Sequence, residues 1–156
     1  MAAMFAALIA ALTYFPKIPI PGGGYVHLGD SMIYIAATFL PTPYALCAAA
    51  IGGGLADIIS GFAIYAPFTV VAKALLTIAF TSHGKMLTRR NALAAAIGLV
   101  ITPAIYFVAD AILAKSFGAA VPGIIWNVAQ AAASIAVFVV IAAAFDKMQI
   151  KNKLKK

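Results

Sequence analysis

Long apolar stretches alternate along the whole chain with short breaks of Pro, Gly and charged residues. The stretches are mostly Ala, Leu, Ile, Val and Phe, without the apolar–polar alternation of a β-barrel strand, so we expect α-helices. The six expected helices cover residues 2–15, 31–40, 44–59, 66–82, 92–113 and 123–145. Because a helix needs about 20 apolar residues to cross a bilayer, several are short. The second and third remain open to being one broken span, which would leave five.

Proline and glycine mark the breaks between the first three helices and a kink in the fifth. The first and second helices are joined by a loop with Pro16, Pro19 and Pro21 followed by glycines at 22–24, and we expect it to act as a lid. Prolines at 41 and 43 separate the second and third helices, and Pro103 predicts a kink in the fifth. No internal repeat is visible, so residues 1–156 are expected to form a single transmembrane domain.

Composition indicates that these helices lie in a membrane. Of the 156 residues, 65% are hydrophobic and 10% are charged, and the mean hydropathy is +1.05. Soluble domains are roughly half apolar and a quarter charged, and a soluble fold of this size leaves roughly 30% of its unfolded surface exposed. We therefore expect an all-α, polytopic membrane protein with a six-helix bundle. This apolar composition excludes a soluble enzyme and a disordered chain. A disulfide scaffold is excluded because Cys47 is the single cysteine.

The net charge of +7 indicates topology rather than a nucleic-acid partner. One basic cluster lies in the tail and another in the loop after the fourth helix. They contain Lys147, Lys151, Lys153, Lys155 and Lys156, and Lys85, Arg89 and Arg90, respectively. Basic residues next to apolar segments mark the cytoplasmic side of a membrane. Six spans put both clusters on one side, so we predict that both termini are cytoplasmic.

Polar side chains within the expected helices gather in the outer half of the bundle, while the inner half is almost wholly Ala, Leu, Ile, Val and Phe. Ionisable residues at membrane depth are costly and indicate function by default. This asymmetry predicts a pocket that opens outward and is closed inward. The candidate substrate-binding residues are His27, Asp30, Asp57, Tyr65, Lys73, Trp126, Asn127 and Gln130. We expect Asp110 at the interface, where Trp126 and the tyrosines would also fit an aromatic belt.

Several of these residues have two open interpretations. Asn127 and Gln130 lie three apart on one helical face, where their amides suit a neutral polar ring or hydroxyl, or else hydrogen bonds between helices. Lys73 suits a phosphate, a carboxylate or a hydroxyl. Asp57 is either the counter-charge of Lys73 in a structural ion pair or a ligand contact. His27 is either solvated in its loop or part of the site.

Small residues form a second pattern, in the first helix. Ala3, Ala7 and Ala11 recur every fourth position, and such stripes let helix backbones approach closely. We expect this face to be a partner interface.

Familiar catalytic and cofactor motifs are absent from the sequence. Gly84-Lys85 is followed by Met86 and position 79 is Ala, so there is no Walker A motif. Two distant histidines and one cysteine do not form a transition-metal site, and no Gly-x-Ser-x-Gly motif occurs. We expect neither an enzyme nor a bound cofactor or metal.

Four stretches resemble one protein family. Residues 24–31 read GYVHLGDS, residues 52–67 read GGGLADIISGFAIYAP, residues 72–75 read AKAL, and residues 122–130 begin the last helix. Together they resemble the substrate-binding S components of energy-coupling factor (ECF) vitamin transporters. The likeness is closest to the riboflavin-type branch and to the short S components assigned to hydroxymethylpyrimidine or pyridoxine.

The resemblance implies an S component of the bacterial or archaeal cell membrane that binds a small water-soluble vitamin from outside. It implies docking on a transmembrane T component, through Ala3, Ala7 and Ala11, with two ATPase subunits. The chain is shorter than usual riboflavin binders, which favours a pyridoxine-like or hydroxymethylpyrimidine-like ligand. A riboflavin-binding S component and an assembly subunit without a ligand remain the alternatives.

Overall fold

A computed structural model of the protein describes residues 1–19 and 25–153. The expected all-α architecture is confirmed, with six helices of more than ten residues in this part of the chain. They are α1 (Ala2–Tyr14), α2 (Gly29–Phe39), α3 (Thr42–Ile59), α4 (Ala66–Ile78), α5 (Arg89–Leu113) and α6 (Phe117–Lys147). Shorter elements are β1 (Ile18–Pro19), β2 (Tyr25–Val26), η1 (Ala63–Tyr65) and α7 (Ile150–Lys153). The expected lid residues 21–24, together with Lys155 and Lys156, lie outside the described residues.

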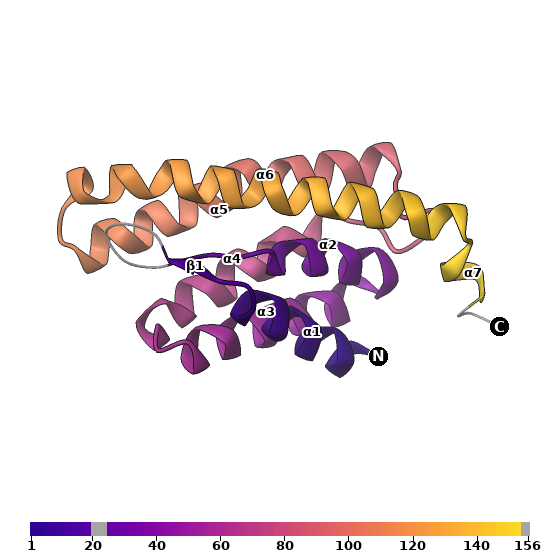
Figure 1. Ribbon diagram of the computed structural model, residues 1–156, viewed down its shortest axis with the longest axis horizontal. Helices are drawn as coiled ribbons and strands as arrows, with labels where there is room; N and C mark the ends of the chain where they lie inside the picture. Colours follow the sequence, from indigo (N-terminus) through magenta and orange to yellow (C-terminus); the bar gives the residue numbers. More distant parts are fainter. Residues whose placement is uncertain (20–24, 154–156) are drawn as a thin grey trace.

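The helices form two packed groups. The long helices α5 and α6 run antiparallel along the molecule, and α1, α2, α3 and α4 pack together along one side of them (Figure 1). The first residues, the loop between α4 and α5 and helix α7 lie at one end, whereas the turn between α5 and α6 lies at the other (Figure 1). Contacts fix the first of these ends, because Lys151 Nζ donates to the Gly84 carbonyl over 3.0 Å. The Asp146 carboxylate also accepts from the Met86 and Leu87 amides, at 2.8 Å each.

Most helix limits follow from local sequence signals. Leu40 is extended and Pro41 precedes the first residue of α3, so α2 and α3 are separate helices. Thr88 and Ser116 cap α5 and α6, since their side chains accept from the amides of Asn91 and Ala119. The cap at Ser116 makes residues 117–122 helical, although we expected them in a loop. The expected extension of the fourth helix to residue 82 is also wrong, because α4 ends at Ile78.

Helix length divides the bundle into long and short spans. Among the described residues, α3, α5 and α6 are long and apolar enough to cross a bilayer. The other three have 11 to 13 residues, which at 1.5 Å per residue is roughly 20 Å, less than the hydrocarbon thickness of about 30 Å. The three short helices therefore cannot cross the hydrocarbon layer by their own length, and they pack against the longer helices.

Close helix approach and aromatic packing stabilise the apolar part of the bundle. A side chain at Gly52 would place its Cβ 2.6 Å from the Ala6 carbonyl, so glycine is required where α1 crosses α3. Tyr34, Phe80 and Phe138 are fully buried and form a cluster with ring centroids 5.4 to 5.9 Å apart. This cluster closes the bundle beneath its polar residues.

Candidate functional site

A buried ion pair lies at the centre of the polar half. Lys73 Nζ of α4 donates to Asp30 Oδ1 of α2 over 2.6 Å, and both side chains are 0% exposed. The hypothesis that Asp57 is the ion-pair partner of Lys73 is therefore wrong. Asp30, which we expected at the outer surface, is buried because Gly29 lets the start of α2 pack directly against Thr13 of α1.

Gln130 and His27 extend this ion pair into a network. Gln130 Nε2 of α6 donates to Asp30 Oδ2 over 3.3 Å, and Gln130 Oε1 accepts from the His27 amide over 3.2 Å. The Gly29 amide donates to His27 Nδ1 over 3.0 Å. Burial and, to a smaller extent, the Lys73 charge lower the pKa of His27 to about 3. His27 is therefore a neutral, buried acceptor rather than a solvated loop residue.

Asp57 belongs to a second set of contacts next to the first. Its carboxylate accepts from the Tyr25 hydroxyl over 3.0 Å and from the Thr69 hydroxyl. Thr69 Oγ1 also lies 2.8 Å from the Tyr106 hydroxyl. The Tyr106 ring connects the two sets, because its centroid lies 5.5 Å from Lys73 Nζ.

Gly53 explains how a lysine side chain fits between α3 and α4. A Cβ at this position would lie 2.8 Å from Lys73 Cγ and 3.1 Å from the Thr69 methyl group. The glycine therefore allows the long Lys73 side chain to cross the face of α3 and reach Asp30. The middle residue of the glycine run 52–54 is thus part of the site's construction.

The remaining candidates lie apart from the Lys73 network. Tyr65 donates to Asp110 Oδ1 over 2.9 Å, which joins η1 to α5 and makes Asp110 a hydrogen-bond partner. Asn127 donates to the Gly123 carbonyl of its own helix over 3.0 Å. Trp126 is 38% exposed. Asn127 and Gln130, although three residues apart, thus make different contacts.

Two hydroxyl residues of these contacts were missed at the sequence level, and their positions follow a rule. Each lies one helical turn from a residue that was singled out: Thr69 precedes Lys73 by four, and Tyr106 precedes Asp110 by four. Residues four apart share a helix face. A search for hydroxyl side chains one turn from each buried charge or amide would have found them.

The small-residue stripe of α1 is uncovered. Ala3, Ala7 and Ala11 are all exposed, while the opposite side of α1 packs on α3 near Ala6 and Gly52. A partner interface at this face remains a prediction.

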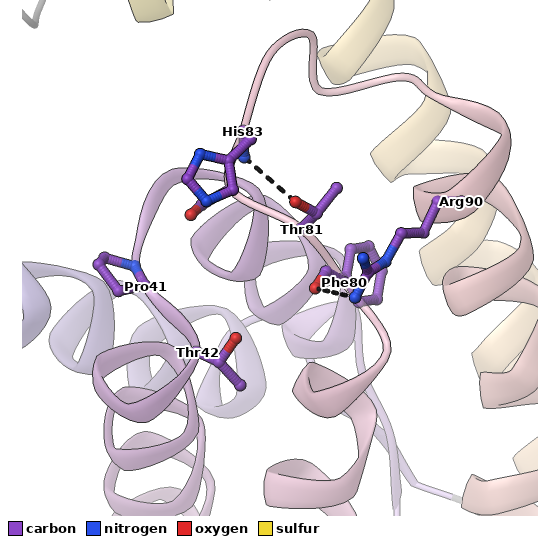
Figure 2. A pocket seen from close by; sticks show the side chains of 7 residues that line it. Pro41, Thr42, Phe80, Thr81, His83 and Arg90 are labelled. Atoms are coloured by element: carbon purple, nitrogen blue, oxygen red, sulfur yellow. Dashed lines mark hydrogen bonds between the residues drawn. The ribbon is translucent and has the colours of Figure 1, made fainter.

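The end of the molecule that carries the loop between α4 and α5 has a hollow whose lining includes none of the residues of the buried network. Its volume is about 440 Å³. Figure 2 shows it between the start of α3 and the segment after α4; it is lined by Pro41, Thr42, Phe80, Thr81, Ser82, His83 and Arg90. The Arg90 guanidinium donates to the Ala79 and Phe80 carbonyls, at 3.0 and 3.5 Å. Its hydrogen bonds thus hold the end of α4.

The chain matches one family model, described as ECF-type riboflavin transporter, S component, over residues 1–147. This match spans every helix that contributes to the buried network. No curated protein matches the chain.

Proposed function

Because the chain belongs to the family of S components of ECF-type riboflavin transporters, we propose that it captures a one-ring vitamin or vitamin precursor. As a member of this family it is an integral cell-membrane protein and the substrate-binding subunit of a vitamin transporter, not an enzyme. The proposed ligand is pyridoxine-like or hydroxymethylpyrimidine-like, bound in the outer half of the bundle. Delivery would need the T component and two ATPase subunits.

The observation that carries the proposal is the buried network of Asp30, Lys73, Gln130 and His27. Charges placed at membrane depth are expensive, and a buried ion pair contributes less to stability than well-packed apolar residues of similar volume. Such a pair is therefore better explained by recognition than by stability. The Lys73 ammonium, the Asp30 carboxylate and the Gln130 amide together offer donors and acceptors to a heteroaromatic ring with polar substituents.

Riboflavin is the second candidate ligand, because the matched family is described by that substrate. All these vitamins combine a heteroaromatic ring with hydroxyl groups, so the same donors and acceptors suit each of them.

The proposed topology places both termini and the loop between α4 and α5 in the cytoplasm. The first residues, this loop and α7 lie at one end of the bundle (Figure 1), and the basic residues Lys85, Arg89 and Arg90 lie there as well. The buried network would then be approached from the opposite, outer end. The exposed face of Ala3, Ala7 and Ala11 would dock on the T component.

Mass spectrometry of the compound released when the purified protein is denatured tests this proposal. The expected result is a one-ring vitamin or precursor from wild type, and its loss from a Lys73→Met variant that still folds. Lys85→Met is the matched control, because Lys85 is exposed at the inner end. Release of nothing, together with no binding to a panel of vitamins, would favour the assembly-subunit alternative.

A further inference from the structure

Five buried hydroxyl groups among the described residues have no hydrogen-bond partner. Two are those of Thr13 and Ser60, and the other three each lie one helical turn from a residue of the contacts described above. These three belong to Tyr34 of α2, Thr102 of α5 and Ser134 of α6, each 0% exposed. Buried polar groups in proteins are almost always hydrogen-bonded, and the lack of water in a bilayer makes an unpaired group more costly. Three such groups in one region indicate that something else supplies their hydrogen bonds.

Tyr34 extends from α2 toward α5. It lies one turn after Asp30, and its ring contacts Phe80 and Phe138, with centroids 5.4 and 5.7 Å away. A Cβ on Gly98 of α5 would collide with the Tyr34 hydroxyl. The phenol oxygen therefore reaches the face of α5 that carries Gly98.

Thr102 lies on that same face, one turn beyond Gly98 and one turn before Tyr106. Since Gly98 adjoins the Tyr34 hydroxyl and Tyr106 adjoins Lys73, Thr102 lies between the aromatic cluster and the ion pair. Helix residues four apart share a face, so all three face the same interior space.

Ser134 occupies the corresponding position on α6. It lies between Gln130, which bonds to Asp30, and Phe138, which contacts Tyr34. The three hydroxyls thus come from three helices, and each lies along its helix between the residues of the polar network and those of the aromatic cluster. Below them, Phe80 and Phe138 form an apolar floor.

We propose that Tyr34, Thr102 and Ser134 form an inner subsite that hydrogen-bonds the alcohol groups of the bound vitamin. This inference rests on the proposed function and adds the part of the ligand that is recognised. Alcohols match these side chains because each hydroxyl both donates and accepts. None of the three is charged, and the charges above them are already paired with each other. A charged substituent at this depth would have no counter-charge among the three.

Two pairs of compounds that differ in alcohol groups test the subsite. Riboflavin is compared with lumiflavin, which has a methyl group in place of the hydroxylated chain, and pyridoxine with 4-deoxypyridoxine. Affinity is measured by fluorescence titration of wild type, Tyr34→Phe, Ser134→Ala and Thr102→Val. Tyr44→Phe is the matched control, because Tyr44 is 60% exposed.

We expect Tyr34→Phe to weaken binding of the hydroxylated member of the pair about tenfold and to leave its deoxy analogue unchanged. Ser134→Ala and Thr102→Val should act in the same direction. Equal loss for both members, or no loss, overturns the subsite while leaving vitamin capture intact. A lower melting temperature of Tyr34→Phe without a change in affinity would instead assign the hydroxyl to a structural water. If wild type binds none of the four compounds, vitamin capture itself fails, and the subsite with it.

Discussion

Removing one charge from the Lys73–Asp30 pair should damage the protein more than removing both. The ion pair is 2.6 Å long and both side chains are 0% exposed, so Lys73→Met leaves the Asp30 carboxylate buried without its cation. An unpaired buried charge typically costs about 3–5 kcal/mol of the free energy of unfolding. The Gln130 amide still donates to Asp30, which places the expected cost toward the lower value, about 3 kcal/mol.

The double variant Lys73→Met/Asp30→Asn separates recognition from stability. With both charges gone there is no unpaired ion, so we expect it to be more stable than Lys73→Met alone, by about 2 kcal/mol or more. Thermal unfolding in detergent measures stability, and fluorescence titration measures vitamin affinity. We predict that the double variant folds but does not bind. A double variant that keeps wild-type affinity would refute the assignment of this pair to ligand recognition. Single-variant stability costs that simply add would refute the coupling of the two charges.

Three further predictions concern packing, pH and assembly. Gly53→Ala should lower vitamin affinity and cost about 1–3 kcal/mol of stability, because the new Cβ would lie 2.8 Å from Lys73 Cγ; Gly118→Ala, whose Cβ meets nothing closer than 3.8 Å, is the matched control. The pKa of His27 is lowered to about 3, so the unfolded chain binds more protons than the folded chain between pH 3 and 6.5. The free energy of unfolding should therefore fall by up to about 1.4 kcal/mol per pH unit as the pH drops below 6.5. The His27→Gln variant should show a flatter slope when unfolding is measured against pH. Ala7→Leu on the exposed face of α1 should abolish co-purification with the T component without changing vitamin affinity, and unchanged co-purification would contradict that interface.

The helices were predictable because their signals are local. Prolines at 41 and 43 mark the break between α2 and α3, and apolar runs define the others to within a few residues. The early start of α6 was missed because Ser116 acts as a cap through its side chain, and a lone serine in a loop is weak evidence for a helix start. A local signal thus defines a helix well and its first turn poorly.

The candidate site was predictable in content but not in pairing. Lys73, Asp30, Gln130 and His27 were all singled out, because ionisable and amide groups are rare in this chain. That Lys73 pairs with Asp30 rather than Asp57 depends on how α2 and α4 are rotated and on the close contact at Gly29. Neither is a property of one segment, so the pairing of Lys73 with Asp30 cannot be predicted from the sequence pattern alone.

Hydroxyl side chains were the least predictable part of the site and of the inner subsite that we propose. Thr69, Thr102 and Ser134 look like ordinary residues of apolar helices, and each acquires significance only from the residues one turn away. Their importance depends on which helix faces meet in the folded bundle.

Equilibrium titration of the purified chain with pyridoxine, hydroxymethylpyrimidine and riboflavin tests vitamin capture most directly. Trp126, the single tryptophan of the chain, provides the fluorescence signal, and the Lys73→Met/Asp30→Asn variant provides the comparison. The predicted result is saturable binding of a one-ring compound by wild type, tighter than that of riboflavin, and no binding by the variant. Absence of saturable binding of all three by wild type, or equal binding by wild type and variant, would contradict the account.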